Sequence, residues 1–481
     1  MGRTIKVDVA VFGSGPAGVG AALAAARTGA RTMLVEKMGA LGGQMTSGLV
    51  TGMHGYRIHK HGVGSGAYWA FDHHTKQVVG GIAEEMVQRL KKKNAAFFDA
   101  EGPNNRVEFD PEALKSTLFE MMTEANVELM LDSFAFGTVM ENGHIKAVRI
   151  ANKNGEELIE AKQYVDATAD GDIAAWAGAP YEIGRAEDGR TMPITLYIKL
   201  GGVNLQKTLD YLKEHPKDLH NGTGADWQKI ADIGGPLEIV GFRSKIQEAF
   251  KNNDYPTPIG AKYGFPYPIF FLEPSFLPKG QTKLLVDMAY GIDSSDAAEL
   301  TKAEIHVRQV QAPAVANFAK KYLPGFEDSY LMETASLIGT RESRRIMGDY
   351  VLNEDDILNN RRFPDVVARC GRAMNVHSPT GGKLDEDRGG QYWIEAEDPK
   401  GYDIPLRCLI PQKVDNLFVS GRCISVTHMA LGSTRGMPVC MATGEAAGTA
   451  AALCSIGSVD GRTLDIKKLQ GALLGNKVIL E

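Results

Sequence analysis

Residues 7–36 decide the fold of this chain and read VDVAVFGSGPAGVGAALAAARTGARTMLVE. An apolar strand over 7–12 leads into a glycine-rich turn over 13–18, and an Ala-rich helix, a second strand over 31–35 and an acid follow. In such a turn the first glycine permits a tight bend, the second lets backbone approach a pyrophosphate, and the third lets helix and strand pack closely. The helix N-terminus faces the phosphates, and an acid about 20 residues further on accepts a ribose hydroxyl. The stretch therefore predicts a dinucleotide site that includes Gly13, Gly15, Pro16, Ala17, Gly18 and Glu36.

The segment that follows Glu36 indicates which dinucleotide is bound. It reads Glu36-Lys37-Met38-Gly39-Ala40-Leu41-Gly42-Gly43-Gln44 and resembles the second FAD-contacting segment of glutathione-reductase-like flavoproteins. In those proteins the acid binds the ribose and a Gly-Gly pair lies against the cofactor. The resemblance implies FAD, with NAD as the alternative, and adds Lys37, Gly42, Gly43 and Gln44 to the expected site.

Three later segments carry the same resemblance along nearly the whole chain. They are DATADGDIAAWAGAP at 166–180, GTRESRRIMGDY at 339–350, and NLFVSGRCISVTH at 416–428 with GEAAG at 444–448. Together they are similar to the FAD-dependent oxidoreductase family that is distantly related to succinate dehydrogenase and fumarate reductase flavoproteins. Ala169 stands where that pattern favours glycine, and Arg422 stands where relatives place an acid for the ribityl chain. The resemblance places Ala169, Asp170, Gly421 and Arg422 at the cofactor, and Arg422 can meet the pyrophosphate.

The resemblance implies an α/β fold, with a discontinuous Rossmann-like FAD-binding domain and an inserted α+β substrate domain. We expect the FAD domain to comprise 1–185, with an insertion at about 55–105, and 399–481. The substrate domain then covers 186–398, which contains no second dinucleotide motif. His54 does not stand before the Gly-Gly pair, where relatives carry the histidine that is covalently attached to flavin. Noncovalent FAD is therefore expected.

Local patterns predict several elements. Apolar residues at helical spacing predict a helix over 82–93, and Pro111 is expected to begin another that reaches Glu124. Alternating residues over 127–150 predict two strands joined at Asn142-Gly143, a typical hairpin turn. Asp172 is expected to cap a short helix that ends near Gly178 and Pro180.

A helix is also predicted after Ser433-Thr434-Arg435-Gly436-Met437-Pro438, because proline suits the first turn of a helix. The N-terminus of such a helix can hold negative charge that develops at the flavin N1 and C2 carbonyl. This role follows mainly from the resemblance, and it places Ser433 and Met437 at the cofactor.

Composition excludes several other kinds of protein. The 481 residues are 43% hydrophobic and 23% charged, and the net charge of −6 argues against nucleic acid as a partner. The five cysteines form no CxxC pair, which excludes a redox-active disulfide of the disulfide-reductase type and gives no motif for an iron-sulfur cluster. Their number and spacing favour free thiols in a cytoplasmic protein. The sequence contains no uninterrupted apolar run of about 20 residues, so a membrane span is not expected. His59, His61, His73 and His74 lack ligand spacing, so no metal site is expected.

The candidate proton-transfer groups are histidines and arginines. His428 is the first choice as general base, because it lies just beyond the strand expected to reach the flavin, and His377 is the second. Arg341, Arg344 and Arg345 form either a fork for a substrate carboxylate or a salt network with Glu342 and Asp349. In fumarate-reductase-like relatives an arginine delivers a proton to carbon, so Arg341 or Arg435 would serve if the enzyme reduces a C=C bond.

The expected function is therefore an FAD-dependent oxidoreductase, a dehydrogenase or oxidase that takes a hydride from a small polar substrate such as a hydroxy acid or sugar derivative. The electron acceptor is open between oxygen, a quinone and a carrier. Two alternatives remain: an FAD-dependent C=C reductase of the fumarate-reductase type, and a flavin-containing interaction module without turnover. A homo-oligomer is compatible with this size and class.

Overall fold

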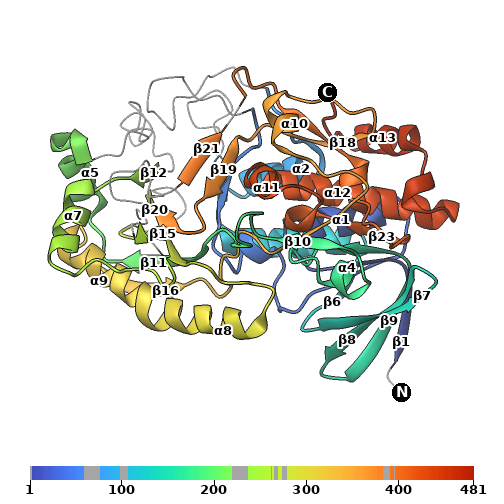
Figure 1. Cartoon of the computed structure of the whole chain (residues 1–481), viewed down its shortest axis with the longest axis horizontal. Coiled ribbons are helices and arrows are strands. Elements are labelled where there is room, and N and C mark those ends of the chain that lie inside the picture. The colour runs from blue at the N-terminus through green and yellow to red at the C-terminus, as the bar shows by residue number, and fades with distance from the viewer. Residues whose placement is uncertain are drawn as a thin grey trace.

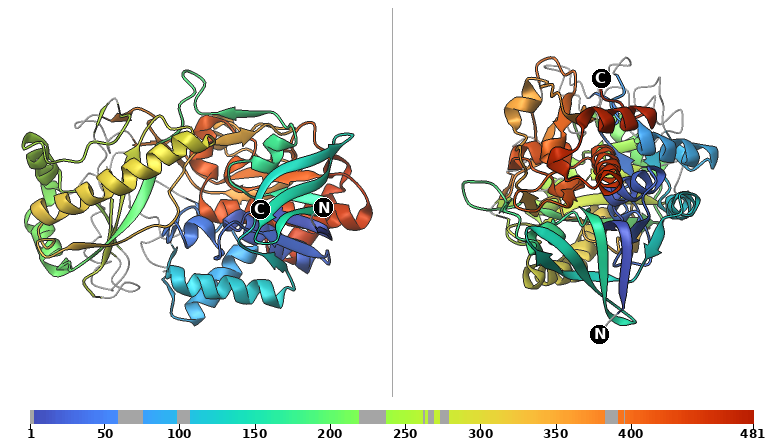
Figure 2. Two further views of the ribbon diagram at one scale, coloured as in Figure 1. Left: turned by 90° about the horizontal axis from the view of Figure 1, so that it is seen from below. Right: turned by 90° about the vertical axis from the view of Figure 1, so that its right-hand side faces the viewer.

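The computed structural model describes residues 3–58, 76–97, 107–218, 237–261, 263–264, 269–272, 279–382, 391–394 and 396–481. Its elements form two lobes that lie side by side (Figure 1). One lobe holds both ends of the chain, and the other is built from residues near the middle of the sequence (Figure 2). Each lobe has a hydrophobic core of its own.

The larger lobe is organised around one mostly parallel sheet. Its strands follow the order β6-β2-β1-β9-β8-β7, and β23 also pairs with β9. Their bounds are β1 Thr4–Phe12, β2 Thr32–Val35, β6 Glu128–Met130, β7 Phe134–Glu141, β8 His144–Asn152, β9 Gly155–Asp166 and β23 Leu417–Val419. The strands β6, β2, β1, β9 and β23 run parallel, whereas β7 and β8 form an antiparallel hairpin at the predicted Asn142-Gly143 turn. The predicted α/β fold with a discontinuous Rossmann-like sheet is confirmed, since β23 joins from the C-terminal part of the chain.

Two helices pack together against this sheet: α1 (Pro16–Arg27) and α12 (Met437–Gly457). Glycines make the close approach possible, because a Cβ at Gly444 would lie 2.0 Å from the carbonyl oxygen of Ala17, and one at Gly448 would lie 2.1 Å from that of Ala21. Among the described helices, only α12 is long and apolar enough to cross a membrane, and 94% of its most apolar window is buried inside the structure. The apolar composition of α12 is thus accounted for by core packing.

Other predicted elements also appear. The helix α3 runs from Pro111–Glu124 as expected, and α2 covers Gly81–Lys92, one residue earlier than predicted at each end. A small antiparallel sheet of β3 (Gly52–Met53), β5 (Val107–Phe109) and β4 (Ala96–Phe97) lies in the same region. All five cysteines are buried free thiols.

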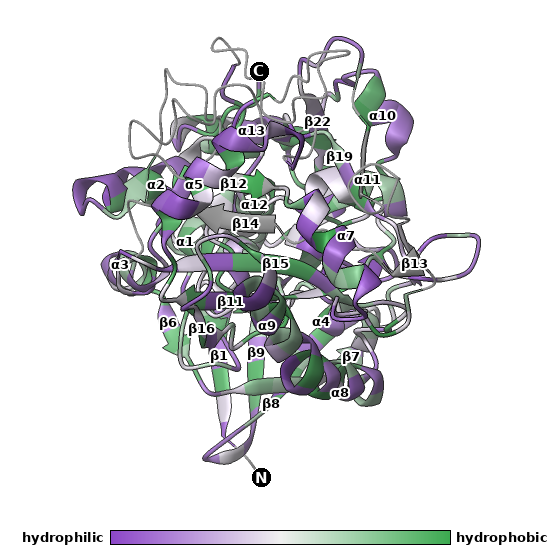
Figure 3. Cartoon of the chain, turned by 90° about the vertical axis from the view of Figure 1, so that its left-hand side faces the viewer, coloured by the Kyte–Doolittle hydropathy of each residue, from purple (hydrophilic) through white to green (hydrophobic). Residues whose placement is uncertain are grey.

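The smaller lobe is an antiparallel sheet with helices, which agrees with the expected α+β insertion. The strand order is β12-β14-β15-β11-β16, and the elements are β11 Ile194–Gly201, β12 Leu237–Val240, β14 Ile269–Leu272, β15 Thr282–Ala289, β16 Tyr330–Thr334, α5 Leu205–Glu214, α7 Arg243–Lys251, α8 Ala297–His306 and α9 Ala312–Tyr322. Figure 3 shows that α7, α8 and α9 mix hydrophilic and hydrophobic residues, as expected for helices with one face on a core.

The two cores divide the chain differently from the predicted boundaries. The core of the smaller lobe takes Leu49 and residues between 194 and 338, whereas apolar residues between 346 and 376 belong to the core of the larger lobe. The boundary predicted at 398 is therefore too late. The returning segment forms a series of short elements. They are β17 Arg344–Ile346 with β10 Tyr181–Ile183, α10 Glu354–Leu358, β18 Val366–Cys370 with β22 Tyr402–Pro405, β19 Met374–His377 with β21 Gln391–Ile394, and β20 Gly381–Gly382 with β13 Tyr263–Gly264. Three further helices are α4 Asp172–Trp176, α11 His428–Thr434 and α13 Ile466–Gly475.

One buried carboxyl group in this core makes stability depend on pH. Glu445 of α12 is 1% exposed, and its Oε2 accepts the backbone N–H of Ile82 at 2.9 Å. Its Oε1 has no hydrogen-bond partner among the described residues. Burial raises the pKa of Glu445 to about 7, although the hydrogen bond from the Ile82 N–H acts in the opposite direction. The folded protein therefore holds a proton here at pH values where the unfolded chain has released it.

Replacement Glu445→Gln removes this pH dependence. Because the folded-state pKa is raised, the free energy of unfolding of the natural protein falls as pH rises from about 4.5 to 7, by up to about 3 kcal/mol from this group. The variant and the natural protein are expected to have similar stability at pH 5, and the variant to be the more stable at pH 8. Urea unfolding at both pH values, with FAD at one fixed concentration, measures the difference. If the two proteins differ in free energy of unfolding by the same amount at pH 5 and at pH 8, the raised pKa of Glu445 is contradicted.

Candidate functional site

Two cavities share lining residues and form one long cleft, which residues of both lobes line. The first, called here the nucleotide end, is lined by residues that include Gly13, Glu36, Phe134 and Trp176. The second, called here the substrate end, is lined by residues that include Arg341, Arg435 and His377. Both are lined by Gly15, Pro16, Gln44, Ala167, Ala169, Thr340 and Arg422. A ligand with two ends, such as a dinucleotide, therefore has one continuous path.

The glycine turn at the centre of the cleft has the geometry that its three predicted roles require. Gly13 has φ +92°, and a Cβ there would lie 2.5 Å from the carbonyl oxygen of Ala167. A Cβ on Gly18 would lie 1.7 Å from the carbonyl oxygen of Gly13. Gly15 has no neighbouring atom within 4 Å of its Cβ position, so its open side faces the cavity. The N-cap of α1 is Gly15, without a side-chain cap, and the N-terminal N–H groups of the helix are available to phosphate.

Glu36 holds the turn and also lines the nucleotide end. Its Oε2 accepts the N–H of Ser14 at 2.7 Å, and its Oε1 accepts the N–H of Met38 at 2.9 Å. A carboxylate has about four acceptor positions, so a ribose hydroxyl can still donate to it. The arrangement fits the predicted role of Glu36.

The segment after Glu36 contributes most of the predicted residues. Lys37, Gly43 and Gln44 line the cleft. Gly42 does not line it, because its Cβ position lies 2.6 Å from Thr46, and its N–H instead donates to the carbonyl oxygen of Ser14 at 2.9 Å. Gly42 therefore ties this segment to the glycine turn without facing the cavity.

The nucleotide end includes two aromatic residues that were not among the predicted cofactor-binding residues. Phe134 at the start of β7 is 53% exposed, and Trp176 at the end of α4 is 38% exposed, yet both line this cavity. Exposed aromatic rings beside a nucleotide site offer stacking surfaces for a base. The sequence held one signal for Trp176, its place within the 166–180 segment, and none for Phe134 beyond its position just after β6.

Trp176→Ala is expected to weaken FAD binding about tenfold, because base–aromatic stacking contributes about 1–3 kcal/mol. Titration of apoprotein with FAD, followed by flavin fluorescence, measures the change. The matched control is Tyr181→Ala, an exposed ring that is not among the lining residues of either cavity. Equal affinities for Trp176→Ala and the natural protein would show that the adenine lies elsewhere.

At the middle of the cleft, Arg422 is held by Asp170. The carboxylate of Asp170 accepts from Arg422 and from the hydroxyl of Ser343. Burial alone would raise the pKa of Asp170, but Arg422 and Ser343 bring it below its usual value. Arg422 lines both cavities, which is the position expected for a contact with a pyrophosphate. Ala169 also lines both and has φ +69°, a left-handed conformation that explains why the family pattern favours glycine there.

Two sequence predictions in this region need correction. Asp172 does not cap α4, because Gly171 is the N-cap residue and Asp172 is the first residue of the helix. Its carboxylate instead lies 2.8 Å from Arg344, while burial and the neighbouring Asp170 and Asp166 raise its pKa to about 6. Ser433 does not line the cleft. It is fully buried within α11, where its hydroxyl donates to the carbonyl oxygen of Arg372 and accepts from Tyr402.

The start of α12 does face the substrate end. Met437, the first residue of this helix, and Cys440 line the cavity together with Gly421. The N-cap Gly436 supplies no side-chain cap, so the first N–H groups of the helix can stabilise a bound anion or carbonyl. This position matches the role that the resemblance assigns to the helix.

At the substrate end, His377 and Arg341 line the cavity, and both contact Asp287, a carboxylate from the smaller lobe that is not among the described lining residues. Nδ1 of His377, on β19, lies 2.8 Å from Oδ2 of Asp287 on β15. Asp287 Oδ1 lies 2.7 Å from the guanidinium of Arg341, which also donates to the carbonyl oxygen of Pro193. Burial would raise the pKa of Asp287, but Arg341 and His377 bring it down to about 2. Burial, aided by Arg341, lowers the pKa of His377 to about 3, so the ring is neutral at physiological pH.

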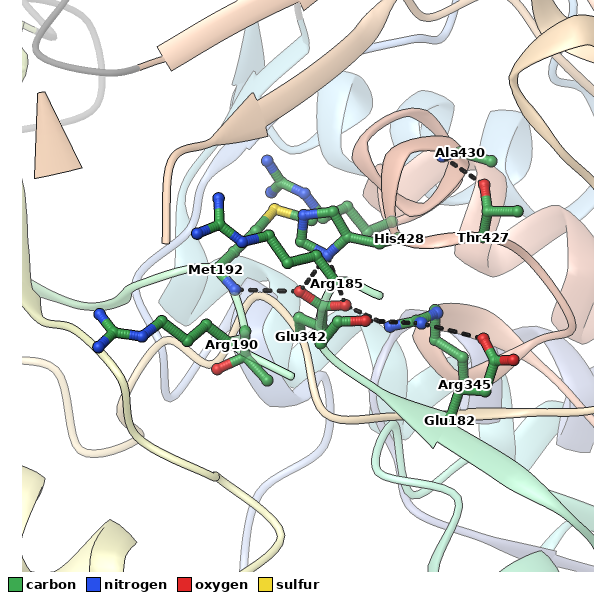
Figure 4. Close-up of polar contacts among 12 residues, drawn as sticks. Glu182, Arg185, Arg190, Met192, Glu342, Arg345, Thr427, His428 and Ala430 are labelled. Carbon is green, nitrogen blue, oxygen red and sulfur yellow. Dashed lines mark hydrogen bonds and ion pairs between the residues drawn. The ribbon is translucent and has the colours of Figure 1, made fainter. Parts of the chain in front are cut away.

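His428 lies in a different network. Its Nδ1 is 2.9 Å from the carboxylate of Glu342, which also accepts from Arg345 and from the N–H of Met192 (Figure 4). His428 is absent from the described lining of both cavities. Of the two candidate bases, His377 therefore lies at the cavity and His428 does not line it among the described residues.

The three arginines of 341–345 separate into different roles. Arg341 lines the substrate end, but Arg344 pairs with Asp172 and Arg345 with Glu342. Asp349 pairs with Arg462 and not with these arginines. The carboxylate fork of three arginines is thus wrong, and the salt-network prediction is correct for Glu342 but not for Asp349.

The remaining histidine predictions concern covalent flavin and metals. His54 lines the substrate end of the cleft. His59, His61, His73 and His74 lie outside the described residues. Within the described ranges no group of three or more His, Cys, Asp or Glu side chains could hold a metal ion.

Comparison with known proteins identifies the family. A family model described as FAD dependent oxidoreductase matches residues 8–473. No curated protein shows significant similarity to the chain. The chain is structurally similar to a geranylgeranyl bacteriochlorophyll reductase-like protein from Thermoplasma acidophilum, with a TM-score of 0.47 and 13% identity over 99% of this chain and 85% of that one. It is also similar to p-nitrophenol 4-monooxygenase PnpA from Pseudomonas putida DLL-E4, with a TM-score of 0.42 and 10% identity over 100% of this chain and 90% of that one.

At these scores the structural likenesses carry no argument about activity, and the assignment rests on the family model. That model covers the glycine turn, the cleft residues and α12 in a single match. The chain therefore belongs to the FAD dependent oxidoreductase family, and FAD is its cofactor.

Proposed function

We propose that the protein is an FAD-dependent dehydrogenase or oxidase that takes a hydride from a small polar substrate, such as a hydroxy acid or a sugar derivative. The observation that carries this proposal is the pair of His377 and Asp287 at the substrate end of the cleft, with Nδ1 and Oδ2 2.8 Å apart. Oxidation of an alcohol needs a base for the hydroxyl proton, and His377 is a neutral imidazole whose orientation is fixed by a carboxylate.

The pair fixes which nitrogen acts as the base. Asp287 is a carboxylate and can only accept, so Nδ1 of His377 carries the proton that it receives. Nε2 is then the unprotonated nitrogen, and no hydrogen bond to it is formed within the described part of the chain. Arg341 on the other oxygen of Asp287 holds the carboxylate in place.

The reaction removes one hydride and one proton from the substrate. The hydroxyl proton passes to Nε2 of His377, the hydrogen on the adjacent carbon leaves with its electron pair, and the C–O single bond becomes a carbonyl. FAD bound in the cleft supplies the two-electron acceptor for that hydride. Asp287 lies beside His377, so its negative charge stabilises the positive charge that the ring gains with the proton.

A C=C reductase remains the second candidate because of one observation. Arg435 lines the same cavity, and burial together with the nearby Arg372 and Arg341 lowers its pKa well below the usual value. An arginine that gives up its proton more readily suits the protonation of a substrate carbon. The donor in that case is Arg435 or Arg341, and the reaction runs in the reducing direction.

Anaerobic spectroscopy separates the two directions. A hydroxy acid or sugar derivative that bleaches the flavin band of the oxidised protein supports the proposal. Recovery of the band when an unsaturated acid is added to the dithionite-reduced protein, with no bleaching by any alcohol, would establish the reductase instead. The electron acceptor follows from the same preparation, by adding oxygen, a quinone or a carrier protein to the substrate-reduced enzyme.

A further inference from the structure

The substrate end has positively charged and neutral donors but no acid among its described lining residues. Two of its arginines already have carboxylate partners, since Arg341 is paired with Asp287 and Arg422 with Asp170. Arg435 differs from both. Its guanidinium donates to the backbone and side-chain oxygens of Asn375, both at 2.9 Å, and no carboxylate lies within ion-pair distance of it in the described structure.

Two buried donors at this point have no partner. Within the described residues, Nε of Arg435 and Nδ2 of Asn375 make no hydrogen bond, and both atoms are shielded from solvent. The orientation of the Asn375 amide is set by its Oδ1, which accepts from Arg435. A buried guanidinium and an adjacent amide N–H without acceptors are costly unless an anion supplies the acceptors.

Asn375 lies at a defined spacing from His377 on the same strand. Asn375 and His377 are two residues apart on β19, so their side chains lie on the same face of the strand, about 7 Å apart along it. Both line the cavity, whereas Val376 between them does not. A carboxylate bound at Arg435 and Asn375 would therefore leave a hydroxyl on the second or third carbon within reach of His377.

We propose that the substrate is a carboxylic acid with its oxidisable hydroxyl on the second or third carbon, and that Arg435 and Asn375 bind its carboxylate. This inference rests on the proposed oxidation for the role of the hydroxyl, but the carboxylate site is independent of that reaction. It narrows the substrate to hydroxy acids and excludes neutral sugars and polyols. Arg435 is thereby a binding residue, and the negative charge it needs comes from the substrate.

The test uses a ligand that cannot be oxidised in the proposed reaction. Propionate and its neutral counterpart propionamide are titrated into the FAD-loaded protein, and binding is followed as a shift in the flavin absorption bands. We expect a saturable shift with propionate and none with propionamide at the same concentrations. Asn375→Asp places a carboxylate of the same size beside Arg435, and Arg435→Met removes the charge. Each is expected to weaken propionate binding at least tenfold, while FAD binding changes little.

The matched control is Arg149→Met, because Arg149 lies on the β7–β8 hairpin and pairs with the exposed Glu156. It should bind propionate like the natural protein. Equal shifts with propionate and propionamide, or propionate binding that neither variant weakens, would overturn the inference. The comparison of propionate with propionamide needs only the natural protein. It therefore tests the carboxylate site even if a variant does not fold.

Lactate and glycerol, added anaerobically, separate this inference from the proposed reaction. Arg435-dependent binding of propionate without bleaching of flavin by any hydroxy acid would support the carboxylate site and reject the proposed oxidation. Bleaching by glycerol without any propionate binding would support the oxidation and reject the carboxylate site. Bleaching by lactate, with glycerol inactive, supports both.

Discussion

Gly15→Val will give a folded protein that binds FAD at least about 100-fold more weakly than the natural protein, a loss of about 3 kcal/mol. Gly15 has φ −62° and ψ −176°, which an L-residue adopts without strain. No atom lies within 4 Å of its Cβ position, so the fold has room for a side chain. That room is the cavity itself, at the position where the backbone must approach the pyrophosphate. Circular dichroism reports the fold, and titration of apoprotein with FAD reports the affinity.

Two other glycines serve as controls for this result. A side chain at Gly18 would lie 1.7 Å from the carbonyl oxygen of Gly13, so Gly18→Val is expected to destabilise the protein itself. Gly471 in α13 has open space around its Cβ position, and Gly471→Ala is expected to keep both fold and affinity. A Gly15→Val protein with the natural affinity would show that the cofactor does not pass over this turn.

His377→Gln will slow the reduction of flavin by substrate about 10³-fold, within the range that general-base catalysis supplies. Glutamine retains a polar side chain of similar size beside Asp287 but has no basic nitrogen. FAD affinity should change little, because His377 lines only the substrate end. The rate constant is measured by anaerobic stopped-flow mixing of the oxidised protein with the substrate that the screen identifies.

His428→Gln is the matched control for the histidine assignment. His428 hydrogen-bonds Glu342 and is not among the described residues that line the cavity, so its replacement should change the rate only a few-fold. The pH profile gives a further check. A base with a pKa of about 3 remains deprotonated down to pH 5, so the rate should not fall between pH 8 and pH 5. A rate that falls below pH 6.5, or a larger loss in His428→Gln than in His377→Gln, would contradict the assignment.

The nucleotide half of the cleft could be predicted because its chemistry is local in sequence. The turn, the helix and the acid of 7–36 form one βαβ unit, so spacing alone identifies Gly13, Gly15 and Glu36. Ser433, which was predicted at the flavin end of the cofactor, shows the limit of this reasoning. It stands close to α12 in sequence, but α11 turns its hydroxyl toward Arg372 and Tyr402 and away from the cavity.

The substrate half could not be ranked from sequence because its groups come from distant segments. His377 gains its significance from Asp287, 90 residues away on the sheet of the other lobe. His428 was favoured because it follows β23 closely, yet α11 places it against Glu342. A pairing that depends on how two lobes meet leaves no periodic or motif signal in either segment.

The visible absorption spectrum of the purified protein, recorded before and after denaturation and removal of the protein, tests the central claim most directly. We predict flavin absorption bands in the native protein and their recovery as free FAD in the supernatant. This result would establish that the cleft binds the cofactor of its family without a covalent bond. A colourless protein that remains colourless after incubation with FAD would contradict the account.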